Sequence, residues 1–100
     1  MKNLKTEILD FDGKSVGKTY GLVLSEVLSV MHQQDQAGNL YRYYTLAEKL
    51  RKETDFKFDK EIKEFILEKV GRIAAPLVYG RLKDFLDEQT KEPVKEENES

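Results

Sequence analysis

The stretch of the chain that comes nearest to a chemical motif reads Gly-Lys-Ser-Val-Gly-Lys-Thr and runs from Gly13 to Thr19. Its composition is close to that of a P-loop, in which backbone N–H groups wrap the phosphates of a nucleotide. A P-loop has four residues between its two glycines, whereas this stretch has three. The remaining sequence also lacks the pattern of the parallel sheet that carries such a loop. We therefore interpret the stretch as a hairpin turn followed by a strand-to-helix junction.

A calcium-binding loop is the second kind of site to consider, at the Asp-Phe-Asp-Gly string of residues 10–13. An EF-hand loop that started at Asp10 would need a glycine at its sixth position and a glutamate at its twelfth. Those positions hold Ser15 and Gly21. We therefore interpret residues 10–13 as a tight turn.

Groups suited to catalysis or cofactor binding are scarce. The chain has no cysteine, and His32 is its only histidine, so a thiol nucleophile, a disulfide and a cysteine-ligated zinc are excluded. His32 lies beside glutamines near the expected end of a helix, where we assign it a structural role. We predict no catalytic residue, no metal ligand, no cofactor and no enzymatic activity. A pair of carboxylates with perturbed pKa values in a pocket would revive the hypothesis of an enzyme.

Acidic and basic residues alternate along residues 60–69. Glutamates and lysines spaced three or four apart on a helix form ion pairs on a solvated face. We interpret the alternation as such a face and not as a set of catalytic carboxylates. Its members are Lys60, Glu61, Lys63, Glu64, Glu68 and Lys69.

The least ordinary feature is the string Tyr-Arg-Tyr-Tyr at residues 41–44. Consecutive residues on a helix point about 100° apart, so three tyrosine rings cannot all face one core. At least one ring should be exposed, and exposed tyrosine beside arginine is typical of protein interfaces and of surfaces that stack nucleic-acid bases. A tyrosine whose ring is packed and whose hydroxyl is solvated is the alternative. The candidate partner-binding residues are Tyr41, Arg42, Tyr43 and Tyr44.

A small, mostly helical fold must position these residues. The Asp-Gly pair at residues 12–13 favours a hairpin between strands at about 4–11 and 14–18. Apolar residues then recur with helical spacing in four segments, and residues 54–59 look like a short strand or an anchored loop. The fold class is therefore mainly α, or small α+β, with an N-terminal β-hairpin followed by four amphipathic helices. The expected helices run from about Thr19 to Gln34, from Leu40 to Lys52, from Lys60 to about Ile73 and from Pro76 to about Glu88.

One globular domain and a tail account for the length of the chain. Hydrophobic residues make up 39% of it, as is typical of a globular protein. We expect residues 1–88 to form the domain and residues 89–100 to be a disordered acidic tail. Residues 87–100 hold six acids and two lysines, a net charge of −4. The other residues carry a net charge of +2, too weak a field to favour nonspecific binding to nucleic acid.

The sequence also bears on cellular location. No apolar run approaches the roughly 20 residues that span a bilayer, and the first residues lack the apolar segment of a signal peptide. The absence of cysteine fits a reducing compartment. We predict a cytoplasmic protein that does not enter a membrane.

Three short segments resemble parts of a group of small bacteriophage or prophage proteins. Those proteins open with an Asp-Phe-Asp-Gly-Lys segment and close with a helix that contains Pro-Leu-Val. The resemblance extends over residues 4–88 and implies a phage or prophage gene expressed in the cytoplasm of a bacterial host. It implies no catalytic residues, and it favours an assembly or host-modulating role over metabolism. The three segments are Leu9–Lys14, Leu46–Leu50 and Ala75–Leu82.

Taken together, these features favour a non-enzymatic protein that binds a partner protein, either a second copy of itself or a phage or host protein. Apolar helix positions beyond a single stripe favour a homo-oligomer. The alternative is a nucleic-acid-binding transcriptional regulator that uses its second and third helices as a helix-turn-helix pair, although residues 53–59 form a longer connection than that motif has. The surplus apolar residues are Leu22, Val23, Val30 and Leu77, and the phosphate contacts of the alternative would be Arg42, Lys49, Arg51, Lys52, Lys57, Lys60 and Lys63.

Overall fold

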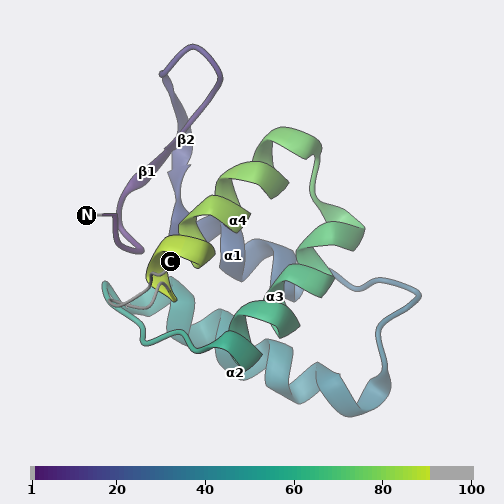
Figure 1. Cartoon of the computed structure of the whole chain (residues 1–100). Helices are drawn as coiled ribbons and strands as arrows, with labels where there is room; N and C mark the ends of the chain where they lie inside the picture. Colours follow the sequence, from purple (N-terminus) through teal and green to yellow (C-terminus); the bar gives the residue numbers. More distant parts are fainter. Residues whose placement is uncertain (1, 91–100) are drawn as a thin grey trace, which may run out of the picture.

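Four α-helices form the body of the protein, and an N-terminal β-hairpin stands out from it (Figure 1). The computed structural model describes residues 2–90. This architecture confirms the fold class that the sequence predicts. The expected tail at 89–100 lies outside the described residues, apart from Gln89 and Thr90, which end the last helix. The elements are β1 (Glu7–Leu9), β2 (Ser15–Thr19), α1 (Tyr20–Ser29), the 3₁₀ turn η1 (Ala37–Asn39), α2 (Leu40–Lys52), α3 (Lys60–Ile73) and α4 (Pro76–Gln89).

The hairpin pairs β1 and β2 antiparallel, with an irregularity in the register between the two strands. Its turn is closed by the Asp10 carboxylate, which accepts hydrogen bonds from two backbone N–H groups of residues 12–14. Gly13 and Gly17 have φ angles of 81° and 86°, which only glycine adopts without strain. The stretch that resembles a P-loop is thus the turn and β2, and Thr19 at its end caps α1. Strand β1 is shorter than the sequence predicts, and β2 has the predicted length but is shifted by one residue.

Helix α1 packs closely against α2 because Gly21 has no side chain. A Cβ atom on Gly21 would lie 2.5 Å from the backbone oxygen of Leu50 and 3.0 Å from that of Leu4. The Gly21 backbone N–H also donates a 2.9 Å hydrogen bond to the Leu4 oxygen. The N-terminal segment, α1 and the end of α2 are therefore held together by backbone contact, and the apolar faces of the helices close around Leu24, Leu50, Ile66, Leu82 and Phe85.

Helix α1 ends at Ser29, five residues before the end that the sequence predicts. Val30 is extended, with φ −84° and ψ 130°, and as the C-cap residue its backbone N–H donates to the Val27 carbonyl at 3.3 Å. His32 is therefore in a loop, where its backbone N–H donates to the Asp35 carboxylate at 3.0 Å. The loop departs from the helix because the Asp35 side chain is held in the interior.

The remaining helices lie where the sequence places them. Helix α2 has the predicted bounds, the Asp59 carboxylate caps α3 by accepting from the Ile62 N–H at 2.8 Å, and Pro76 occupies the first turn of α4. Residues 53–59 form an anchored loop without an assigned strand, since the Leu4 N–H donates to the Thr54 carbonyl at 2.9 Å. No helix among residues 2–90 is long and apolar enough to cross a membrane.

Candidate protein-binding site

The tyrosine string lies in the first half of α2, and its three rings divide between interior and surface. Tyr43 is buried and stacks on Phe65 of α3, with ring centroids 4.9 Å apart. Tyr41 and Tyr44 are 75% and 58% exposed, and their centroids lie 5.8 Å apart. The helical spacing therefore leaves two adjacent rings on the surface, one more than the minimum that the sequence requires.

Arg42 does not join the two exposed rings. Its guanidinium lies 4.1 Å from the centroid of the Phe65 ring, and its Nη2 atom is 3.8 Å from the Glu61 carboxylate. Both contacts direct the side chain toward α3. The four candidate residues thus serve two purposes, since Arg42 and Tyr43 join α2 to α3 while Tyr41 and Tyr44 remain free for contact.

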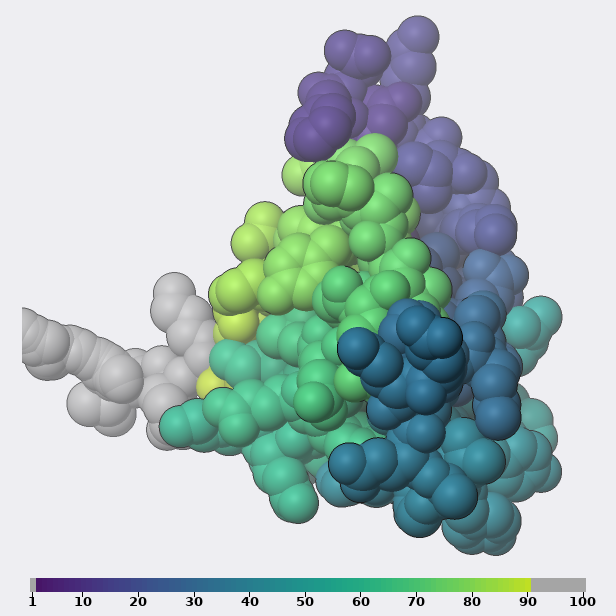
Figure 2. Space-filling model, turned by 90° about the vertical axis from the view of Figure 1, so that its right-hand side faces the viewer, coloured from purple at the N-terminus to yellow at the C-terminus, as the bar shows by residue number. Residues whose placement is uncertain are grey.

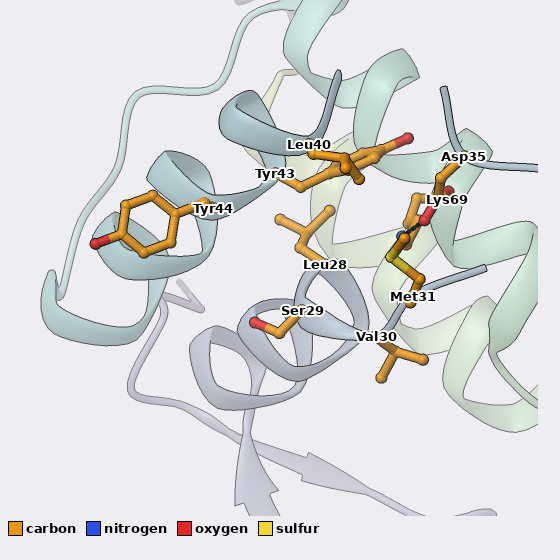
Figure 3. Close-up of a pocket in the computed structure, with 9 residues that line it drawn as sticks. All are labelled: Leu28, Ser29, Val30, Met31, Asp35, Leu40, Tyr43, Tyr44 and Lys69. Atoms are coloured by element: carbon orange, nitrogen blue, oxygen red, sulfur yellow. Dashed lines mark hydrogen bonds and ion pairs between the residues drawn. The ribbon is translucent and has the colours of Figure 1, made fainter. Parts of the chain in front are cut away.

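A groove opens beside Tyr44, where the end of α1 meets the start of α2 (Figure 3). Its volume is about 190 Å³. Figure 3 shows Leu28 pointing toward Leu40 and Tyr43, with Tyr44 at one end of the view and Asp35, Lys69 and Met31 at the other. We use "the groove" for this hollow, which is lined by Leu28, Ser29, Val30, Met31, Asp35, Leu40, Tyr43, Tyr44 and Lys69.

The rim of the groove is unusually apolar for a solvated surface. Met31 is 75% exposed, and Val30 and Leu40 are also exposed. Tyr44 lines the groove with them, and the Tyr41 ring lies beside Tyr44, so large exposed apolar side chains gather here. Such patches on soluble proteins mark sites of contact with another molecule. The exposed Met and Tyr side chains also match the composition of interface cores.

Three charged side chains form a buried cluster, which we call the Asp35 cluster, at one end of the groove. The Asp35 carboxylate contacts the Lys69 ammonium, and its other oxygen accepts from Arg72 at 2.7 Å. The Asp35 side chain is fully buried and that of Lys69 is 1% exposed. The Lys69 ammonium also lies 4.3 Å from the Tyr43 ring, and Arg72 donates to the Tyr43 hydroxyl at 3.3 Å. The cluster thus joins the loop after α1 to α2 and α3.

The cluster favours the charged forms of Asp35 and Arg72. The hydrogen bond from Lys69 lowers the pKa of the Asp35 carboxyl from 3.8 to about 2, with help from Arg72 and the His32 N–H and against the effect of burial. The hydrogen bond to Asp35 in turn raises the pKa of Arg72. Asp35 is therefore an anion at neutral pH, and it holds the loop after α1 against α3 (blue over green in Figure 2).

The placement of Lys69 corrects a prediction from the sequence. Lys69 was expected on the solvated face of α3 with its neighbouring charges, but it is buried and paired with Asp35. Its position gave a signal, since it lies four residues after Phe65 and three after Ile66, on the apolar stripe of the helix. No comparable signal marks Asp35 in the sequence, because a polar turn segment does not reveal which of its side chains points inward.

The four residues proposed for an oligomer interface differ in their exposure. Val23 is only 8% exposed and belongs to the core, which makes that assignment wrong. Leu22 and Leu77 are half-buried. Val30 is exposed and lies at the groove. Of the four, Val30 alone lines the groove, so they do not form one shared contact face there.

Several of the basic residues proposed as phosphate contacts already have acidic partners. Lys52 lies 3.1 Å from Glu48, Lys63 lies 3.0 Å from Asp87, and Arg42 pairs with Glu61. The other four, Lys49, Arg51, Lys57 and Lys60, are exposed. Within the described part of the chain, no group of three or more acidic or histidine side chains is placed to hold a metal ion.

Comparisons with known proteins add no assignment. No family model, curated protein or solved structure matches this chain. The resemblance to small phage proteins therefore stays a prediction from the sequence.

Proposed function

We propose that the protein is a non-enzymatic binding protein that docks a partner protein at the groove and the adjacent Tyr41–Tyr44 surface. The observation that supports this is the pair of exposed side chains Met31 and Tyr44 at an apolar hollow, with the exposed Tyr41 ring beside Tyr44. Aromatic and methionine side chains supply much of the binding energy in protein interfaces. Because the buried cluster and the helix core hold these elements in place, little conformational entropy would be lost on binding.

The biological setting that we propose is a phage or prophage protein acting in the bacterial cytoplasm. Its support is the resemblance of three short segments, and it extends to an assembly or host-modulating role. The partner would be a phage protein, a host protein or a second copy of the chain. Of these, self-association is the simplest to test, by sedimentation at about 100 µM.

A capture experiment tests the docking surface. The tagged full chain is used to retain proteins from a bacterial lysate, beside a Tyr41→Ser/Tyr44→Ser double variant and a Phe11→Ser control. Phe11 is 82% exposed on the hairpin, so the control also removes an exposed ring, far along the chain from the groove. We expect the wild type and the control to retain the same protein and the double variant to lose it. Retention of the same protein by all three would contradict the proposed surface.

Nucleic-acid binding is the second candidate, and one observation favours it. Tyr41 and Tyr44 form an exposed aromatic pair on α2, whose last turn carries Lys49, Arg51 and Lys52. Aromatic pairs beside basic residues stack and hold single strands. A labelled single strand or duplex that fails to bind at about 50 mM salt would dispose of this candidate, since electrostatic binding is strongest at low salt.

A further inference from the structure

The outward face of α2, the helix along the lower edge of the molecule in Figure 1, carries four exposed side chains in one stripe. Tyr41, Tyr44, Glu48 and Arg51 follow one another at intervals of three, four and three residues. This is the spacing of the a and d positions through which two helices pack along a seam. Because all four side chains are exposed, no helix among residues 2–90 covers this stripe, which we call the α2 seam.

The chemistry of the α2 seam changes along the helix. Its first half is aromatic, since Tyr41 and Tyr44 are 75% and 58% exposed and lie side by side. Its second half is charged, with Glu48 followed by Arg51 in the last turn. A guanidinium is attracted to the face of an aromatic ring. Each half therefore offers what the other half can bind, so the seam is complementary to a copy of itself that runs in the opposite direction.

We propose that α2 pairs antiparallel with α2 of a second copy of the chain. The pairing sets Tyr41 of each copy opposite Arg51 of the other, and Tyr44 of each copy opposite Glu48 of the other. The tyrosine hydroxyl is a donor and the carboxylate an acceptor, so the inner contacts are also matched. Because the contact has two-fold symmetry, the ring-to-guanidinium contact forms twice, once at each end of the helix pair.

The antiparallel direction also keeps like charges apart. Arg51 faces position 41 of the other copy, so the two Arg51 residues are separated by about 15 Å along the helix axes. This exceeds the Debye length of about 10 Å at 0.1 M salt. A parallel pair would instead place Arg51 against Arg51 and Glu48 against Glu48. The distribution of charge along the seam therefore selects the antiparallel direction.

This inference rests on the proposed function, because it names a second copy as the partner that contacts Tyr41 and Tyr44. A single helix of 13 residues offers a small contact compared with α2 and its neighbours together. Stable interfaces bury roughly 1,200–2,000 Å² in total. We therefore expect a weak dimer, with a Kd on the order of 100 µM.

Sedimentation of the full chain at rising concentration tests the pairing. We expect the average mass to rise from that of a monomer toward that of a dimer between about 20 µM and 1 mM. Arg51→Glu should weaken the dimer about tenfold, because both ring-to-guanidinium contacts are lost. Lys49→Glu is the matched control, since Lys49 is exposed on the same turn but lies about 100° around the helix from Glu48. This control should dimerise like the wild type.

Cysteine crosslinking tests the direction of the pair, because the chain has no cysteine of its own. A Tyr44→Cys variant is mixed with a Glu48→Cys variant and oxidised mildly. The antiparallel pair brings these two positions of different copies together, so we expect the mixed disulfide as the main product. Self-linked products of each variant in place of the mixed one would indicate a parallel pair and contradict the inference.

A wild type that stays monomeric up to about 1 mM would overturn the inference, as would equal weakening by Arg51→Glu and Lys49→Glu. The exposed tyrosines would then belong to a different protein or to nucleic acid, which the capture and labelled-strand experiments distinguish. A monomeric chain that still retains a lysate protein through Tyr41 and Tyr44 would keep the proposed function. The failure of the dimer and the failure of the docking surface are therefore separate results.

Discussion

Within residues 2–90, a carboxylate held between two cations occurs twice, once in the interior and once on the surface. Asp35 contacts Lys69 and Arg72, and its side chain is fully buried. Asp87 contacts Lys63 at 3.0 Å and Lys83 at 2.7 Å, and its side chain is 41% exposed. Each cluster consists of one carboxylate and two cations, a lysine and an arginine around Asp35 and two lysines around Asp87. They differ in what surrounds them.

That difference decides what each cluster does. Water screens the charges around Asp87, where one partner is a neighbour on the same helix and the other is on α3, so the pairs add little stability. No such screening acts on Asp35, and each cation left without it would remain buried. The buried cluster also joins three parts of the chain and places an ammonium at the groove. Burial therefore turns one of two similar clusters into part of a candidate site.

Replacement of Asp35 by alanine should show the largest effect. It leaves Lys69 buried without its anion and Arg72 with the more distant Glu68 carboxylate at 3.8 Å. We therefore expect the midpoint of urea unfolding to fall by roughly 1–2 M. The matched Asp87→Ala change should leave the midpoint within about 0.3 M of the wild type, because its lysines become solvated. Equal falls in the urea midpoint for the two variants would show that burial does not make the Asp35 cluster contribute more stability than the Asp87 cluster.

Acid should lower the stability of the folded protein by protonating the same carboxylate. The pKa of Asp35 is lowered from 3.8 to about 2 in the folded state. A group with a lowered folded pKa contributes stability above its unfolded pKa and loses it as the pH falls through the folded pKa. The urea midpoint should therefore fall between about pH 4 and pH 2, by less than Asp35→Ala lowers it at pH 7.

A second measurement separates the buried carboxylate from the surface one. The pKa of Asp87 is also lowered, mainly by its hydrogen bond from Lys83, so part of the acid effect comes from the surface. Added salt screens exposed charges far more than buried ones. The part of the acid-induced fall in the urea midpoint that Asp87→Ala abolishes should disappear in high salt. The part that Asp35→Asn abolishes should persist. An acid effect that salt removes entirely would contradict the assignment to Asp35.

The sequence predicted the elements better than it predicted the site. Helix α2 has the predicted bounds, and Asp59 and Pro76 start α3 and α4, because caps and apolar spacing are local signals. The exposed rings of Tyr41 and Tyr44 also follow from helical geometry alone. The end of α1 did not follow, since it depends on Asp35 reaching residues on α3, more than 30 positions later in the chain.

The site could not be assembled from the sequence because its charged part is a long-range pair. The alternation of charges along α3 has the pattern of a solvated face, and only the fold shows that Lys69 departs from it. The groove likewise depends on where α1 stops, since Val30 and Met31 line it only after the helix has ended. The spacing of residues along the chain predicts helices. A pocket depends instead on how segments that are distant in the chain are placed relative to one another.

Methionine substitutions at Lys69 and Lys63 give the smallest and most discriminating effects. Lys69→Met removes one of two cations from Asp35 and keeps a side chain of similar length, so we expect a loss of roughly 1 kcal/mol in the free energy of unfolding. Lys63→Met removes one of two cations from Asp87, whose carboxylate water can then solvate, and the loss should be at most about 0.5 kcal/mol. Urea unfolding at low and high salt measures both. If Lys69→Met instead costs as much as Asp35→Ala, Arg72 cannot hold the loop after α1 alone, and the two cations act as one unit.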